Sequence, residues 1–318
     1  MRFSRLVFAN FDDATLSGDL WDRVRSCADE VVLVSADSPE YLSSIAGADG
    51  LVLRLGMSAD ASLLSGAPQL RYIGMLGTDF GRIDIEEART RGIVVANIAD
   101  YSTASVAEFS LGMALDLFRD FSAERHRAST GDLGETLHLG RELASLNVGV
   151  VGTGNLGQHV ARLYAAGIGS SVSYWSRNRR PGLEEELGIE YLPLDELAAH
   201  SDLLSVNLAL NPETEGILDG DLIRSLPLGA GLINTSPNEL VDLEVVLERC
   251  ESGAIRYASD HGDELSAPML ARAQQTPNVY LYPPIGFATQ EASRRKLEIL
   301  VSNIEAFLAG APTNHVNR

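Results

Sequence analysis

A glycine-rich turn between an apolar run and an amphipathic stretch is the feature that most limits how this chain can fold. Residues 146–151 form an apolar run rich in valine, typical of a buried strand in a parallel sheet. Gly152, Gly154 and Gly157 follow with the spacing Gly-x-Gly-x-x-Gly, and residues 156–164 then place apolar side chains on one helical face. A glycine-rich turn in another kind of α/β protein is the alternative, but this order of strand, turn and helix favours a doubly wound sheet.

The three glycines have separate tasks in such a turn. Gly152 makes the tight bend, Gly154 lets the backbone approach a pyrophosphate, and Gly157 lets the helix pack against the strand. N–H groups at the start of the helix then bind the phosphates. The sequence therefore predicts a dinucleotide site whose turn consists of Gly152, Thr153, Gly154, Asn155, Leu156 and Gly157.

Short apolar runs alternate with helical stretches along the whole chain, which is typical of an α/β protein. The expected strands are residues 6–9, 31–35, 51–53, 72–75, 93–96, 146–151, 171–175, 203–208, 232–235, 255–258 and 279–282. The last six match a complete dinucleotide-binding domain. Helices are expected at about 85–91, 104–123 and 289–309, whereas the polar residues 125–141 are interpreted as an arm or extended loop. That arm is either a floppy connection or a dimer contact.

Composition excludes several classes of protein. The chain has 318 residues and a net charge of −19, so we expect no nucleic-acid partner and no anionic membrane surface. It has no run of about 18 apolar residues and no signal-peptide pattern, which favours a cytoplasmic protein without a membrane span. Cys27 and Cys250 are far apart, as expected of buried thiols in a reducing compartment, and no metal site is predicted.

Five separated motifs together resemble the D-2-hydroxyacid dehydrogenase family over nearly the whole chain. They are residues 92–97 with 101–103 and 106–108, residues 151–157, residues 194–197 with 201–202 and 211–214, residues 233–235 with 241–242, and residues 307–310 with 314–317. The resemblance implies a flavodoxin-like substrate domain of residues 1–99 plus 286–318. It also implies a dinucleotide-binding domain of residues 100–285 inserted in it, an active-site cleft between the two, and usually a homodimer.

The same resemblance implies further cofactor contacts outside the glycine turn. Asp260 is expected to face the amide of the nicotinamide, as its counterpart does in the family. The same cleft is expected to be lined by Asn207, Thr235 and Ser236. Val106 is also expected to contact the cofactor.

The residues after the second strand of the dinucleotide domain indicate which cofactor is preferred. Family members that prefer NAD have an acidic residue there, which accepts hydrogen bonds from the ribose. Residues 175–180 read Trp-Ser-Arg-Asn-Arg-Arg, without a carboxylate. Ser176, Arg177 and Arg179 suit a 2′-phosphate, because a hydroxyl donates to it and guanidinium groups pair with it. We therefore predict NADP(H), with NAD(H) as the other cofactor; the alternative is a solvated basic loop.

Several positions depart from the family pattern. Pro237 stands where the substrate-binding arginine is implied, and Pro284 where the proton-donating histidine is implied. Leu265 stands at the position of the implied glutamate, with Glu264 one residue earlier. Proline offers neither a proton nor a charge. Asp79 replaces a glycine of the carboxylate-binding loop and would repel a carboxylate if it faced the cleft.

Two functions remain open. The first is an NAD(P)H-dependent reductase of a small carbonyl or imine substrate, with His261, Glu264, Tyr101 or Tyr282 handling the proton. Each of these residues has an alternative, non-catalytic role. A loop histidine or glutamate is commonly a surface group, and a tyrosine commonly packs in the protein core. The second is a catalytically inactive NADP(H)-binding regulatory or scaffold protein. A replacement acid or base beside Asp260 favours the enzyme, and His261 stands there.

Overall fold

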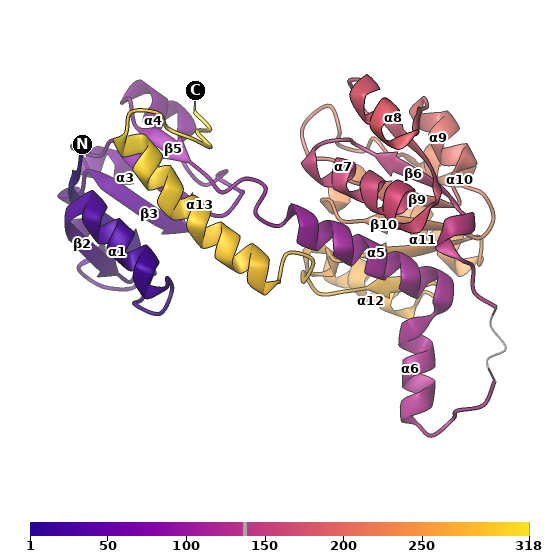
Figure 1. Ribbon diagram of the computed structural model, residues 1–318. Helices are drawn as coiled ribbons and strands as arrows, with labels where there is room; N and C mark the ends of the chain where they lie inside the picture. The colour runs from indigo at the N-terminus through magenta and orange to yellow at the C-terminus, as the bar shows by residue number, and fades with distance from the viewer. Residues whose placement is uncertain (136–138, 318) are drawn as a thin grey trace. The chain divides into compact units, whose positions relative to one another are not determined.

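The computed structural model describes residues 1–135 and 139–317, which form two compact units (Figure 1). The first unit joins Met1–Tyr101 to the C-terminal residues from Gln290 onward, and the second is Ser102–Thr289. Each unit contains one parallel β-sheet with helices on both faces. The predicted α/β class is therefore confirmed.

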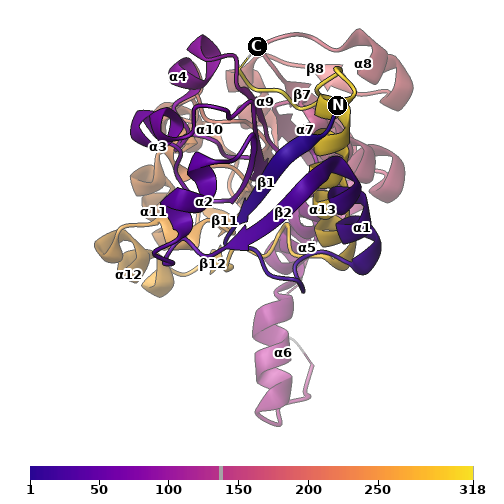
Figure 2. The same ribbon diagram turned by 90° about the vertical axis from the view of Figure 1, so that its left-hand side faces the viewer.

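The first unit is built on a five-stranded sheet with the order β2-β1-β3-β4-β5. Its strands are β1 (Phe3–Ala9), β2 (Ala28–Val34), β3 (Gly50–Arg54), β4 (Tyr72–Leu76) and β5 (Val94–Ala96). One face packs against α1 (Gly18–Cys27) and α13 (Gln290–Leu308), and the other against α2 (Tyr41–Ala46), α3 (Ala61–Gly66) and α4 (Ile85–Thr90) (Figure 2). This is the flavodoxin-like order, in which the direction of winding reverses between β1 and β3.

The C-terminal residues complete the edge of this sheet beside β5. Asn317 accepts a hydrogen bond from the Val95 amide at 2.9 Å and donates one to the Ile93 carbonyl at 2.7 Å. His315 forms an antiparallel bridge with Ala96. The tail therefore covers an edge strand that would otherwise expose unpaired backbone groups.

The second unit is built on a seven-stranded sheet with the order β12-β11-β10-β9-β6-β7-β8. Its strands are β6 (Asn147–Val151), β7 (Ser171–Trp175), β8 (Glu190–Tyr191), β9 (Leu203–Val206), β10 (Ala230–Asn234), β11 (Ile255–Ser259) and β12 (Val279–Leu281). The six expected strands are present. The two-residue edge strand β8 was not predicted, because two residues carry no periodicity.

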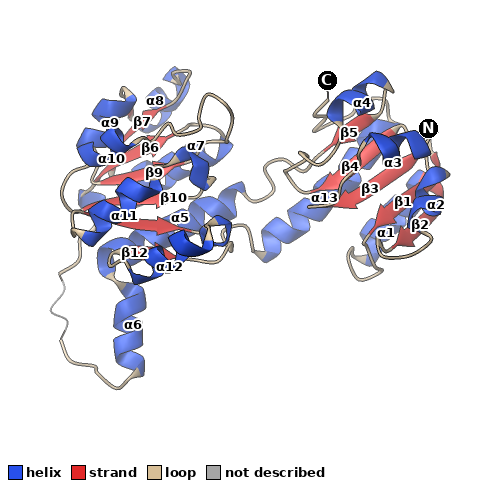
Figure 3. Cartoon of the chain, turned by 180° about the vertical axis from the view of Figure 1, so that it is seen from behind, coloured by secondary structure: helices blue, strands red, loops and turns tan. Residues whose placement is uncertain are grey.

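Helices cover both faces of this larger sheet (Figure 3). One face packs against α5 (Thr103–Arg119), α7 (Asn155–Arg162) and α8 (Pro181–Leu187). The other face carries α9 (Leu194–His200), α10 (Gly220–Ser225), α11 (Leu243–Glu251) and α12 (Ala267–Gln275). Among the described residues, no helix is both long enough and apolar enough to cross a membrane.

The expected helix over residues 104–123 is interrupted at Asp120. This residue has a left-handed φ of 51°, and a separate helix α6 (Phe121–Ser129) begins after it. Residues 125–129 are therefore helical, so the prediction of a loop is wrong there, and residues 136–138 of the predicted arm lie outside the described residues. The side chains of α6 are not buried within the second unit.

Candidate functional site

The glycine turn after β6 leaves no room for side chains at two of its three glycines. Gly152 has a φ of +90°, and a Cβ atom there would lie 2.6 Å from the Asn207 carbonyl oxygen. A Cβ atom on Gly157 would lie 1.8 Å from the Gly152 carbonyl oxygen. Gly154 is different, because a Cβ there would meet nothing within 4 Å. Backbone packing alone therefore requires glycine at positions 152 and 157. At Gly154 the fold leaves open space, so packing does not require glycine there.

Helix α7 begins directly after this turn without a capping side chain. Gly154 is its N-cap residue and has no side chain to satisfy the first N–H groups. Thr153 is buried, and its carbonyl oxygen accepts a hydrogen bond from the Gln158 side chain at 3.2 Å. Leu156 packs into the core of the unit, while Asn155 is exposed. An uncapped helix start beside an open backbone is a suitable anion site.

Ser176 lies at the end of β7 but is occupied by internal hydrogen bonds. Its hydroxyl accepts from Thr153 Oγ1 at 2.9 Å and donates to the Asn178 carbonyl oxygen at 2.7 Å. Only 9% of Ser176 is exposed. In this arrangement the serine stiffens the turn, and its single proton is not available to a phosphate.

The arginines after Ser176 have different partners. Arg179 makes two 2.8 Å hydrogen bonds to Glu184, which also accepts one from the Tyr174 hydroxyl. Arg177 pairs with Glu213, and both side chains are largely exposed, at 74% and 67%. An exposed ion pair is weak, so Arg177 can change partner more readily than Arg179.

Arg177 borders a hollow of about 320 Å³ at the carboxyl ends of β7 and β9. Its other lining residues are Trp175, Leu208, Ala209, Asn211, Glu213, Thr214 and Ile217. The hollow therefore has an apolar wall and a cation at its rim, which suits a flat apolar ring attached to an anionic group. Glu213 was not predicted as a site residue, although its Asn-Pro-Glu-Thr motif was noted in the sequence.

Three more predicted cofactor residues follow the carboxyl ends of β9 and β10. Ser236 Oγ donates to the Val206 carbonyl oxygen and accepts from the Leu208 amide, at 3.2 and 3.1 Å. Thr235 Oγ1 donates to the same carbonyl oxygen at 3.3 Å. Asn207 is buried and has a side-chain oxygen without a hydrogen-bond partner among the described residues. These groups tie two strand ends together, and Asn207 leaves one acceptor for a ligand.

Asp260 follows β11 and carries a second unpartnered acceptor. Only 6% of the residue is exposed, and its Oδ1 atom has no hydrogen-bond partner within the described chain. Burial raises the pKa of this carboxyl group, while the His261 charge and the Gly286 amide act against that rise. A Cβ on Gly286 would lie 2.7 Å from Asp260 Oδ2 and 3.7 Å from a Val106 methyl group, so Val106 is close to this site. A buried acceptor without a hydrogen bond costs free energy, so a ligand that donates to it would be favoured.

His261 and Glu264 lie together beside Asp260. The imidazole Nδ1 is 3.0 Å from Glu264 Oε1, and Nε2 is 3.6 Å from Asp260 Oδ1. The His261 side chain is 23% exposed, whereas Glu264 is 44% exposed. Glu264 therefore fixes the orientation of the ring through Nδ1, whereas Nε2 lies beyond hydrogen-bond distance of Asp260. The three residues form a cluster that opens toward solvent through His261 and Glu264.

The two candidate tyrosines are engaged elsewhere. Tyr282 donates to Asp116 at 2.5 Å, and burial together with Asp116 raises the pKa of the phenol above its usual range. Ser122 also donates to Asp116 through its amide and its hydroxyl, so this carboxylate joins α5 and α6 to the end of β12. Tyr101 belongs to the first unit, where its ring packs against the core and lies 5.2 Å from Lys296 Nζ. The structure brings His261 and Glu264 together, and assigns Tyr282 to an internal contact.

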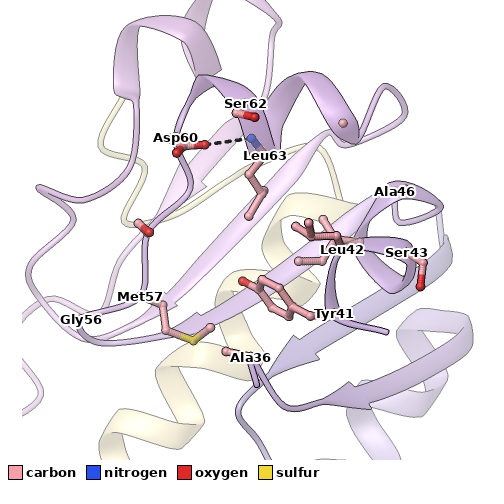
Figure 4. A pocket seen from close by; sticks show the side chains of 13 residues that line it. Ala36, Tyr41, Leu42, Ser43, Ala46, Gly56, Met57, Asp60, Ser62 and Leu63 are labelled. Atoms are coloured by element: carbon pink, nitrogen blue, oxygen red, sulfur yellow. Dashed lines mark hydrogen bonds between the residues drawn. The ribbon is translucent and has the colours of Figure 1, made fainter. Parts of the chain in front are cut away.

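A hollow of about 710 Å³ in the first unit lies between α2 and α3 (Figure 4). Tyr41, Leu42 and Met57 line it, and no cation does so. Its one carboxylate, Asp60, accepts a hydrogen bond from the Leu63 amide at 2.9 Å and so caps α3. The hollow lacks the charged and titratable groups found around Asp260.

The residues of the second unit fit a dinucleotide. The space at Gly154 is where a Cβ would block a phosphate, and the orphaned oxygens of Asn207 and Asp260 need donors. All three residues follow carboxyl ends of strands, and β6 and β9 are the neighbours at which the winding of the sheet reverses. Among residues 1–135 and 139–317, no group of three acidic, histidine or cysteine residues could hold a metal ion.

Comparison with known proteins assigns the chain to a family. Residues 111–286 match the family description "D-isomer specific 2-hydroxyacid dehydrogenase, NAD binding domain". Glyoxylate reductase of Thermococcus litoralis is 31% identical, over 87% of this chain and 86% of that protein. Hydroxypyruvate reductase of Blautia hydrogenotrophica is 29% identical, over 89% of each. A solved structure from Thermus thermophilus superposes with a TM-score of 0.81 at 29% identity, covering 98% of this chain and 99% of the other. The open glycine turn, the order of the strands and these matches agree, and the chain belongs to the D-isomer-specific 2-hydroxyacid dehydrogenase family.

Proposed function

We propose that this protein is an NADP(H)-dependent reductase of a small carbonyl or imine compound, with catalytic residues that differ from the family pattern. The observation that carries the proposal is the group formed by Asp260, His261 and Glu264. It places an oriented, titratable imidazole next to the buried carboxylate at the carboxyl edge of the dinucleotide sheet. Glyoxylate and hydroxypyruvate, after which two relatives are named, are the first substrates to test.

In this proposal the roles of the residues follow from their contacts. The glycine turn and the start of α7 bind the pyrophosphate, and Asp260 and Asn207 accept hydrogen bonds through their orphaned oxygens. Bound NADPH supplies the hydride. His261 donates the proton to the reduced atom, and Glu264 holds the ring in place through Nδ1. Pro237 and Pro284 occupy the positions where the family resemblance implies an arginine and a histidine.

The preference for NADP(H) is supported by the charge at the end of β7. Arg177 is exposed, lies at the rim of the 320 Å³ hollow and, among the described residues, is held only by Glu213. A 2′-phosphate can replace this carboxylate as the partner of Arg177, because a dianion is the stronger acceptor for a guanidinium group. Arg179 is bound to Glu184 and contributes less, and the hydroxyl of Ser176 is already used.

A second function is supported by the two prolines. If no other group supplies a proton, the chain binds NADP(H) without transferring hydride and acts as a regulatory or scaffold protein. The exposed helix α6 is in either case the surface through which we propose that two copies pair. The buried free thiols of Cys27 and Cys250 agree with a cytoplasmic location.

The test compares turnover with cofactor binding. Wild-type protein is assayed for NADPH consumption with glyoxylate, hydroxypyruvate, other ketones, aldehydes and imines, and NADPH binding is measured by fluorescence. His261→Gln is expected to lower kcat by about 100-fold or more, because general acid catalysis contributes about that much. Its NADPH affinity is expected to stay within about twofold, and Asp263→Asn on the same short turn is the matched control.

The outcomes separate the two functions. Turnover that depends on His261 supports the reductase. NADPH binding without turnover of any substrate in the panel supports the regulatory protein, and turnover unaffected by His261→Gln refutes the proposed proton donor.

A further inference from the structure

His261, the proton donor proposed above, lies in a short turn that follows β11. Residues 262–264 form a single 3₁₀ turn, whose hydrogen bonds are weaker than those of an α-helix. The His261 amide donates to Ser259 Oγ at 3.1 Å, and the His261 carbonyl oxygen accepts from the Glu264 amide at 3.2 Å. These bonds are all local, so they shape the turn from within and do not join it to another part of the sheet.

One hydrogen bond reaches this turn from the end of another strand. Asn238 follows β10, and its Nδ2 atom donates to the His261 carbonyl oxygen at 2.8 Å, a favourable length. Among the residues that the structure describes, the other hydrogen bonds of residues 261–264 have partners within residues 259–265. Asn238 therefore ties the turn of His261 to the loop after β10.

The loop that carries Asn238 is itself firmly held. Pro237 leads into it with a φ of −51°, an angle that the proline ring restricts. Two backbone hydrogen bonds of 2.8 and 3.0 Å join the following 3₁₀ turn, residues 238–240, to residues 216–218. Leu240 of the same turn is completely buried. The loop thus gives the Asn238 side chain a fixed position from which it can support a neighbouring residue.

The position of the His261 turn decides where the free edge of the imidazole lies. Glu264 accepts a hydrogen bond, so the ring nitrogen next to it, Nδ1 at 3.0 Å, carries a hydrogen atom. The other nitrogen, Nε2, is the atom left to deliver a proton. Such a transfer needs a distance of about 2.6–3.2 Å to the reacting atom. A misplacement of about 1 Å can lower the rate about 100-fold, so a loose turn would be costly.

We infer that Asn238 is a positioning residue for His261, because its amide group anchors the His261 carbonyl group to the loop after β10 and so fixes where Nε2 lies. The inference rests on the proposed function for the role of His261 as proton donor. It also gives Pro237 a task. This proline stands where the family resemblance implies an arginine, and it leads the chain into the turn that presents Asn238.

A double-mutant cycle tests this role, using Asn238→Leu, which keeps a side chain of similar size and removes the donor. In the wild-type background this change is expected to lower kcat about tenfold or more, because Nε2 is no longer held in place. KM and NADPH affinity are expected to stay within about twofold, since binding of the substrate and cofactor is not affected. In the His261→Gln background the same change is expected to alter kcat less than about twofold, because no imidazole is left to position.

A second measurement needs no substrate. Amide hydrogen exchange of residues 261–265 is expected to rise about 2- to 10-fold in Asn238→Leu, as expected for the loss of one hydrogen bond. Glu239→Ala is the matched control, because Glu239 is exposed on the same 3₁₀ turn, and it is expected to keep wild-type kcat and exchange. Circular dichroism and NADPH affinity verify that each variant is folded.

Three results would overturn the inference: wild-type kcat in Asn238→Leu although His261→Gln loses activity, equal losses of kcat in the two backgrounds, or unchanged exchange of residues 261–265. Failure of the proposed function gives a different result. Turnover that survives His261→Gln, or no turnover of any substrate, rejects the proposed reductase mechanism, and the exchange measurement then still decides whether Asn238 holds the turn.

Discussion

Replacing Gly154 by alanine separates the demands of folding from those of cofactor binding. The residue has φ −67° and ψ −170°, a conformation that alanine adopts readily, and its added methyl group would meet nothing within 4 Å. Without cofactor we expect Gly154→Ala to be as stable as the wild type, or more stable by about 0.4–1 kcal/mol, because the unfolded chain loses freedom.

The same methyl group occupies the space through which a phosphate approaches the start of α7. If it removes one charge-assisted hydrogen bond between backbone and phosphate, the loss is about 1.5–3 kcal/mol. That corresponds to about a 10- to 150-fold weaker affinity for NADPH. Urea unfolding measures the stability of the variant, and fluorescence titration or calorimetry measures its affinity for NADPH.

Gly157→Ala is the matched control with the opposite behaviour. Its methyl group would lie 1.8 Å from the Gly152 carbonyl oxygen, so the turn must move, at a cost of about 1–3 kcal/mol or more. We expect this variant to lose stability with or without cofactor. Wild-type NADPH affinity in Gly154→Ala would refute the placement of the pyrophosphate at this turn.

Two further predictions concern charges in the second unit. Arg177→Asp should weaken NADPH binding at least tenfold and change NADH affinity less than threefold, because only NADPH carries the 2′-phosphate; equal losses in the titrations would exclude a phosphate contact. At pH 7, Asp260→Asn should have a higher free energy of unfolding than the wild type, as measured with urea. At pH 3.5 this gain should be smaller. Burial raises the pKa of Asp260 in the folded protein, so its ionisation costs stability progressively as the pH rises from about 3.9, the unfolded value, through the raised value. The same gain at both pH values would contradict this cause.

Most of the fold could be predicted from periodicity and glycines. The strands around Gly152 are apolar on both faces, and a parallel sheet covered twice by helices is the arrangement that buries them. The break at Asp120 could not be predicted, because helical spacing continues across it. That corner depends on Tyr280 and Tyr282, which donate to Asp120 and Asp116 from more than 150 positions away in the sequence.

The site was predictable where the backbone dictates the residue, as at Gly152 and Gly157. The site was harder to predict where a side chain has several possible hydrogen-bond partners. Ser176 and Arg179 look like phosphate ligands in the sequence, but in the structure the Ser176 hydroxyl donates to Asn178 and two of the N–H groups of Arg179 donate to Glu184.

The closure of the first sheet by Asn317 has a consequence for synthesis on the ribosome. Asn317, the hydrogen-bond partner of Val95 and Ile93, is synthesised 222 and 224 residues after them. The core of the same unit also awaits Leu300, Val301 and Ile304. The nascent polypeptide can therefore assemble its inserted cofactor domain first, whereas residues 1–101 gain their full set of contacts only after residues 290–317 have been synthesised.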